Sequence, residues 1–242
     1  RFKQYEQELL EAEVYPDDVW VISYPKSGTT WTQEMVWLIC NDLNFEAARA
    51  ESLQIRFPFL EKIFYHALYL MSLAEDPNIN LSIFLFSVSL IHPTDTSSFE
   101  RAKNTPRPRF IKTHLPVSML PRRYWEVKPK TIHIRRNPKS VAVSYFYHSQ
   151  GIHYRGSMDT FLRSFVREHQ FYSPYHAHVI EYHELQDCDN ILYLSFEEMK
   201  HYLPSVVRKV CEFFGKAYSK PELELLYQHL SFKSMRDNPT VN

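Results

Sequence analysis

Hydrophobic and polar positions along this chain form two patterns, short apolar runs and stripes at helical spacing. Four mainly apolar runs have the length and composition of strands buried in a parallel sheet; they are Val19–Tyr24, Arg109–Lys112, Thr131–Arg135 and Ile191–Ser195. Three stripes recur at helical spacing; they comprise Trp31, Met35, Leu38 and Ile39, then Phe161, Leu162, Phe165, Val166 and His169, then Val206, Val207, Val210, Phe213 and Phe214. Gly215 suits a helix C-cap, and Pro221 suits the start of a further helix over Glu222–Leu230. Alternating strands and helices predict an α/β fold, a single domain with a central parallel sheet flanked by helices.

The segment 41–108 is the least regular part of the chain, because Pro, Asn and Ser interrupt it repeatedly. We expect it to form a lid or a wall of a substrate pocket. Its most apolar run, Ile79–Ile91, contains four polar residues. A membrane span needs about 20 residues, so this run favours buried core or a pocket wall over a membrane segment.

Composition narrows the function classes. The length of 242 residues suits one domain, and 28 basic against 28 acidic residues give no net charge, which disfavours a nucleic-acid or membrane partner. The three cysteines, Cys40, Cys188 and Cys211, lack metal-binding spacing and are typical of reduced thiols. With no signal peptide visible, we expect a cytoplasmic protein without a metal site.

The first strand runs directly into a tight loop and a helix start. Backbone N–H groups at a helix start lack intrahelical partners, so they attract anions. Gly28 permits a close turn, Lys26 adds positive charge, and hydroxyl donors come from Ser27, Thr29 and Thr30. This P-loop-like segment predicts phosphate binding. An ordinary helix cap remains the alternative. A nucleotide kinase is a weaker hypothesis, because Lys26 precedes the glycine and no Mg²⁺ ligand set is evident.

Two further strands end in residues suited to chemistry. His114 follows Arg109–Lys112, where an imidazole could remove a proton from a hydroxyl substrate. A structural role is the alternative, because the chain has twelve histidines. Arg136 follows Thr131–Arg135 and precedes a helix start at Asn137-Pro138, where a guanidinium can grip a phosphate. An exposed basic turn is the alternative there.

These segments together resemble the PAPS-dependent cytosolic sulfotransferases. The similar sequences are Tyr-Pro-Lys-Ser-Gly-Thr-Thr-Trp at 24–31, Lys-Thr-His-Leu-Pro at 112–116 and Arg-Asn-Pro-Lys-Ser-Val-Ala-Val-Ser at 136–144. The resemblance implies an enzyme that moves a sulfuryl group from 3′-phosphoadenosine 5′-phosphosulfate (PAPS) to a hydroxyl acceptor by in-line transfer. The product would be 3′-phosphoadenosine 5′-phosphate (PAP), and no metal would be needed.

The resemblance also implies roles for particular residues. His114 would be the base, with Lys26 and Lys112 stabilising charge, while Arg136 and Ser144 would hold the 3′-phosphate and Trp31 would pack against adenine. The implied cofactor-binding set is Lys26, Ser27, Gly28, Thr29, Thr30, Trp31, Arg136, Ser144, Phe196, Ser231, Phe232 and Met235.

The chain departs from the family pattern at several positions. Ser140 replaces the usual Asp, Phe196 a common Tyr and Leu230 a common Thr. The family's Arg-Lys-Gly element, which closes over the 3′-phosphate, and its dimer motif would both come after Asn242. We therefore expect one sulfotransferase domain over 1–242 that is truncated at both ends, with homodimerisation left open. The alternative is a catalytically inactive binding or regulatory relative.

Aromatic residues cluster around the implied base. They are Phe57, Phe59, Phe64, Tyr65 and Tyr69 before it, and Tyr145, Phe146, Tyr147, His148 and Tyr154 after the Arg136 segment. An aromatic pocket suits a small apolar acceptor such as a phenol, a steroid-like molecule or another alcohol.

Overall fold

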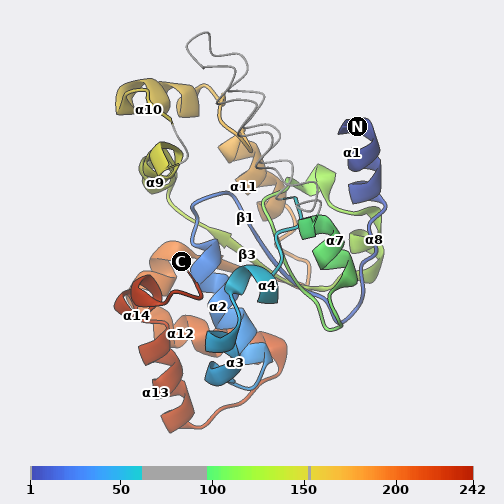
Figure 1. Cartoon of the computed structure of the whole chain (residues 1–242), viewed down its shortest axis with the longest axis vertical. Helices are drawn as coiled ribbons and strands as arrows, with labels where there is room; N and C mark the ends of the chain where they lie inside the picture. Colours follow the sequence, from blue (N-terminus) through green and yellow to red (C-terminus); the bar gives the residue numbers. More distant parts are fainter. Residues whose placement is uncertain (1, 62–96, 152–153, 242) are drawn as a thin grey trace.

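Four parallel strands form the centre of the molecule. The computed structural model describes residues 2–61, 97–151 and 154–241. The strands are β1 (Val19–Ser23), β2 (Phe110–Thr113), β3 (Lys130–Arg135) and β4 (Ile191–Ser195), and they pair in the order β2-β1-β3-β4. All three pairings are parallel. This confirms the predicted α/β fold, and it places β1 between the strands that precede His114 and Arg136 (Figure 1).

Helices surround the sheet. They are α1 (Phe2–Leu10), α2 (Thr29–Cys40), α3 (Phe45–Ala50), α4 (Leu53–Arg56), α7 (Ser97–Asn104), α8 (Arg122–Val127), α9 (Pro138–Gly151), α10 (Met158–Val166), α11 (Tyr175–His183), α12 (Phe196–Phe214), α13 (Lys220–His229) and α14 (Phe232–Asp237), with a 3₁₀ turn at Val117–Met119. Each predicted helical stripe lies in one of these helices, except that α10 ends before His169. Gly215 caps α12 in the left-handed conformation, as predicted.

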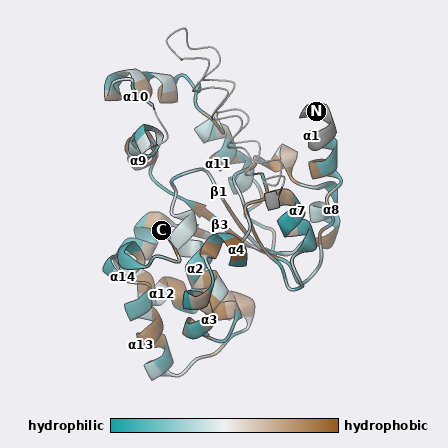
Figure 2. Cartoon of the chain, in the orientation of Figure 1, coloured by the Kyte–Doolittle hydropathy of each residue, from teal (hydrophilic) through white to brown (hydrophobic). Residues whose placement is uncertain are grey.

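The two faces of the sheet carry separate hydrophobic cores. Val19 and Val21 of β1 pack into one core with α2 and α12, whereas Trp20 and Ile22 pack into the other with α1, α8 and α11. This alternation follows from the two-residue period of a strand. Figure 1 shows α2, α3, α12 and α13 together on one side of the strands, with α1, α7 and α8 on the other. In Figure 2, α13 carries both brown and teal turns, and α14 is largely teal.

The irregular region is only partly described. Residues 41–61 form α3, α4 and a short extended segment against β2, where Phe59 pairs with Lys112. The apolar run Ile79–Ile91 and the predicted lid lie largely outside the described residues. Among the helices that the structure describes, none is both long and apolar enough to cross a membrane.

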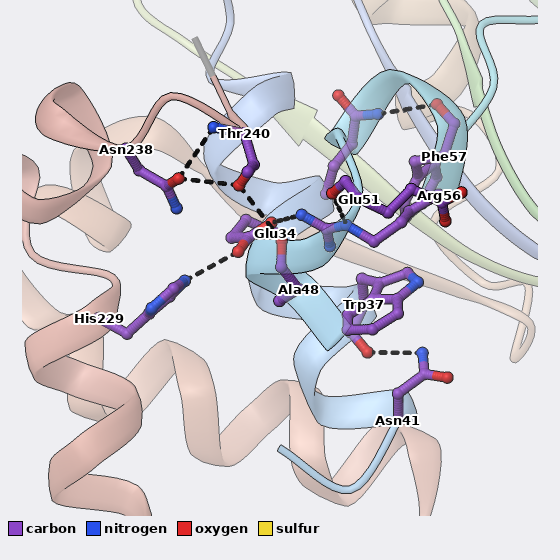
Figure 3. A network of polar contacts seen from close by, with 11 residues as sticks. Glu34, Trp37, Asn41, Ala48, Glu51, Arg56, Phe57, His229, Asn238 and Thr240 are labelled. Atoms are coloured by element: carbon purple, nitrogen blue, oxygen red, sulfur yellow. Dashed lines mark hydrogen bonds and ion pairs between the residues drawn. The ribbon is translucent and has the colours of Figure 1, made fainter. Parts of the chain in front are cut away.

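A buried polar network joins α2 to distant parts of the chain (Figure 3). Glu34 of α2 is fully buried, and its carboxylate lies 2.8 Å from Arg56 Nη2 of α4 and 2.8 Å from His229 Nε2 of α13. Thr240 joins the same region, because its hydroxyl donates to the Ala48 carbonyl and its own carbonyl accepts from Leu53 N–H. The network therefore connects α2, α4 and α13 through one buried carboxylate.

Candidate active site

The loop between β1 and α2 adopts a backbone conformation that requires glycine at position 28. Lys26 and Gly28 both have positive φ, 67° and 101° respectively. A Cβ atom on Gly28 would lie 2.7 Å from Cδ2 of Phe196, so a larger residue would both strain the backbone and displace that ring. The loop thus delivers the first turn of α2, with its unpaired N–H groups, directly beside Phe196.

A cavity of about 670 Å³ opens at the carboxyl ends of the strands, the end at which open α/β sheets bind ligands. It is lined by twelve of the residues singled out from the sequence: Lys26, Gly28, Thr29, Thr30, Trp31, Lys112, His114, Arg136, Ser144, Phe196, Phe232 and Met235. Ser27 and Ser231 do not line it. Ser27 is fully buried, and the Ser231 hydroxyl caps α14 by accepting from Ser234 N–H.

His114 has a defined tautomer. Its Nδ1 lies 2.6 Å from the Ser23 carbonyl oxygen, which can only accept, so Nδ1 carries the proton and Nε2 a lone pair. Phe59 and Tyr172 enclose the ring edge-on, at centroid distances of 5.1 and 5.4 Å. Burial, reinforced by the charge of Lys112, holds the imidazole pKa well below its usual value. The ring is therefore neutral at physiological pH and able to accept a proton.

Two cations converge at the phosphate loop. Arg136 Nη1 donates to the Lys26 carbonyl at 3.0 Å, and the guanidinium lies 4.1 Å from the centre of the Phe196 ring. Burial and the charge of Arg136 lower the pKa of Lys26. Arg136 Nε is buried and finds no hydrogen-bond partner among the described residues. Unmatched positive charge beside a helix start fits a phosphorylated ligand.

An apolar surface adjoins these cations. The rings of Trp31 and Phe196 meet at 72° with centroids 5.8 Å apart, and Phe232 and Met235 line the same cavity. The indole nitrogen of Trp31 is buried and lacks a partner within the described part of the chain. A planar heterocycle fits such a surface, because aromatic rings offer both stacking and edge contacts.

The predicted aromatic cluster divides between the cavity and the core. Phe59, Tyr145 and His148 line the cavity, whereas Phe57 and Phe146 are buried in the core. Of the remainder, Tyr147 is exposed, Tyr154 lies against Phe146 and Phe161 outside the cavity, and Phe64, Tyr65 and Tyr69 fall outside the described residues.

The sequence analysis missed two residues beside His114. Tyr172 lines the cavity from a loop, and no periodicity marks it. Glu61 is fully buried, with Oε1 2.6 Å from His114 N and Oε2 2.8 Å from Thr113 Oγ1. No sequence pattern marks it either, because its partners are distant along the chain. Burial raises the pKa of this carboxyl to about 7.

The Lys26–Thr30 loop, a second cationic helix start at Arg136 and a neutral histidine share one cavity, so the chain is an α/β protein with a cavity suited to a phosphorylated ligand. Residues 16–242 match the family model described as "Sulfotransferase domain". The chain therefore belongs to the sulfotransferase family, as its motifs predicted.

Similar curated proteins cover the whole chain. It is 38% identical to the luciferin sulfotransferase of Photinus pyralis over 245 aligned positions, which cover 100% of this chain and 62% of that protein. It is 34% identical to sulfotransferase 1A1 of Canis lupus familiaris, covering 100% of this chain and 73% of the relative. The chain thus spans about three fifths of the luciferin sulfotransferase.

Solved structures share the fold. Retinol dehydratase, in complex with androsterone and the inactive cofactor PAP, superimposes with a TM-score of 0.80 and 30% identity, covering 99% of this chain and 71% of that one. Mouse sulfotransferase SULT7A1 complexed with PAP gives a TM-score of 0.72 and 25% identity, with coverages of 98% and 71%.

Proposed function

We propose that this chain transfers a sulfuryl group from PAPS to the hydroxyl of a small acceptor and releases PAP. The observation that carries the proposal is the single cavity in which the Lys26–Thr30 loop, Arg136 and His114 meet. Family membership and the PAP named in two similar structures support the choice of nucleotide.

Each end of the nucleotide has a matching part of the cavity. The Lys26–Thr30 loop would hold the 5′-phosphosulfate, and Arg136 with Ser144 would hold the 3′-phosphate. Trp31 and Phe196 would pack against adenine, with Phe232 and Met235 beside them. The unpartnered Arg136 Nε supports this assignment, because a phosphate oxygen would give it an acceptor.

His114 would act as the base. PAPS supplies a sulfuryl group bonded to a phosphate oxygen, and this bond breaks as the acceptor oxygen bonds to sulfur. His114 Nε2 would take the acceptor's hydroxyl proton while Nδ1 stays fixed to the Ser23 carbonyl. Lys26 and Lys112 would stabilise negative charge on the transferring and departing oxygens.

The acceptor would lie against Phe59, Tyr145, His148 and Tyr172, beside the base. These rings favour a small apolar alcohol, such as a phenol or a steroid-like molecule. The relatives' names agree with that class, since they include a luciferin sulfotransferase and a complex with androsterone.

Calorimetry with PAP tests the nucleotide site. Arg136→Ala should weaken binding by at least about tenfold, since a charge-assisted hydrogen bond contributes roughly 1.5–3 kcal/mol. Arg135→Ala is the matched control, because this neighbouring arginine is exposed and does not line the cavity. Equal losses in both variants, or no PAP binding by the unmodified chain, would contradict the proposal.

A transfer assay with PAPS and a panel of phenols and sterols follows. Sulfated product establishes the activity. Tight PAP binding without transfer to any acceptor would instead support the alternative, a binding protein that retains the nucleotide site.

A further inference from the structure

The segment that carries Glu61 lies alongside β2 and forms an isolated parallel bridge with it at Phe59 and Lys112. Lys112 N–H donates to the Pro58 carbonyl at 3.0 Å, and Leu60 N–H donates to the Lys112 carbonyl at 2.8 Å. The Phe59 ring contacts both Lys112 Nζ, 4.3 Å from its centre, and the His114 ring. This pairing fixes the position of Glu61 relative to the end of β2.

The Glu61 carboxylate organises three consecutive residues, the last of β2 and the first two of the loop that follows it. Oε1 accepts from His114 N–H, and Oε2 accepts from the Thr113 hydroxyl. Thr113 Oγ1 in turn accepts from Leu115 N–H at 3.1 Å. The backbone on both sides of His114 is therefore tied to one carboxylate.

His114 is then held at two independent points. Glu61 fixes its backbone, and the Ser23 carbonyl fixes its ring at Nδ1. Only Nε2 remains for chemistry. A base must lie within hydrogen-bond reach of the proton it removes, so both points matter for the direction of Nε2.

We propose that Glu61 is a positioning residue for His114, one that holds residues 113–115 so that Nε2 faces the acceptor. The inference rests on the proposed function, in which His114 is the base. Glu61 does not line the cavity, so it would act through His114 and not by touching the acceptor.

The ionised form of Glu61 is the one that satisfies this arrangement. Both oxygens accept hydrogen bonds as observed, whereas a protonated oxygen would donate to Thr113 and leave the threonine hydroxyl proton without its acceptor. Lys112 is a nearby charge that favours ionisation, and Tyr182 also lies close enough to be affected by the carboxylate. The burial of a carboxylate here is costly, which a purely structural role would not require.

Three variants separate positioning from general stability. Glu61→Gln keeps the shape but replaces one acceptor with an amide donor. Thr113→Val removes the Oε2 contact and the acceptor of Leu115 N–H, but keeps the Oε1 contact to His114 N–H. Glu181→Gln is the matched control, because Glu181 is a half-buried carboxylate that accepts Val117 N–H at 3.1 Å in the same loop without contacting His114.

Turnover and PAP affinity are measured for each variant between about pH 5.5 and 8.5. Glu61→Gln should lower kcat by about 10- to 100-fold while PAP affinity stays within about twofold. The rise of kcat through the titration of Glu61, near pH 7, should disappear in this variant. Thr113→Val should lower kcat less, and Glu181→Gln should keep both the rate and the pH profile. Unchanged kcat in Glu61→Gln, or equal losses of kcat and PAP affinity, would overturn the inference.

A second readout does not depend on activity. In histidine-labelled protein, the His114 imidazole signal is identified by its absence in His114→Ala. Glu61→Gln should move this signal and Glu181→Gln should not, while an unmoved signal in Glu61→Gln would overturn the inference. If the unmodified chain binds PAP but transfers nothing, the proposed function fails while this signal still decides the role of Glu61.

Discussion

Among the described residues, His114, His133 and His178 are buried histidines that differ in where their rings lie. The His114 ring bonds to the Ser23 carbonyl and lines the cavity. His133 stacks on Tyr182 at 4.5 Å and approaches His178 at 6.0 Å, away from the cavity. Burial lowers the pKa of all three, so a low pKa alone does not identify a base. Of these three, His114 is the one that lines the cavity.

Removal of the His114 imidazole should abolish transfer and spare the nucleotide site. We expect His114→Ala to lose about 10²- to 10⁴-fold in kcat with PAP affinity nearly unchanged, because general-base catalysis contributes that much. Kinetics and calorimetry on the same preparation measure both, and His183→Ala, at an exposed histidine, is the control. Normal turnover by His114→Ala would refute the base assignment.

The pH dependence of the base has a definite sign. As the proposed base, His114 would act only when neutral, and burial holds its pKa well below 6.5. Activity controlled by His114 should therefore be constant at neutral pH and fall only as the pH drops well below 6.5. Glu61→Gln removes the carboxyl group that titrates near pH 7. In this variant, the loss of kcat at acidic pH should therefore reflect protonation of His114 alone.

At the scale of elements, each candidate segment is a strand that ends in a loop or helix start. Sequence patterns predicted all four strands to within a residue or so, since buried parallel strands are short and almost wholly apolar. They also predicted the αL cap at Gly215. The pairing of 58–61 with β2 was not predictable, because it joins short segments about 50 residues apart and includes a proline. Glu61 and Tyr172 were missed for the same reason, as their roles come from tertiary neighbours.

Two glycines allow the loop conformation to be tested. Gly28→Ala should destabilise the fold by about 1–2 kcal/mol through its positive φ, and should weaken PAP binding further by displacing Phe196. Gly215→Ala has the same backbone problem at φ 67°, but nothing lies within 4 Å of its Cβ. Urea unfolding should register both changes, whereas PAP calorimetry should register only Gly28→Ala. Equal PAP affinities would show that the loop tolerates a side chain.

At the scale of the whole molecule, the Glu34 network ties α2 to α4 and α13 (Figure 3). Arg56 belongs to α4, just before the segment that carries Glu61, and His229 precedes α14, whose Phe232 and Met235 line the cavity. Breaking a buried ion pair of this kind costs free energy of folding, because the remaining charge is neither paired nor hydrated by solvent.

Arg56→Ala should lower the free energy of unfolding by about 3–5 kcal/mol, since it leaves the fully buried Glu34 carboxylate with the His229 contact but without its arginine partner. Arg107→Ala is a close comparison, because Arg107 also pairs with a carboxylate and covers an aromatic ring, but at an exposed site. Its urea midpoint should hardly move. Similar shifts in the two variants would mean that burial of the Arg56–Glu34 pair adds nothing.

The parallel strand order β2-β1-β3-β4 also determines how late in folding the candidate site is assembled. Ser23 and His114 meet across 91 residues, and Glu34 and His229 across 195. Closing such long loops costs entropy before any contact offsets it, so these pairings should form late in folding. A chain still leaving the ribosome would present the Lys26–Thr30 loop long before His114 and Arg136 could join it. Capture of PAP during refolding should therefore mark the completed molecule, behind the earlier gain of helical signal.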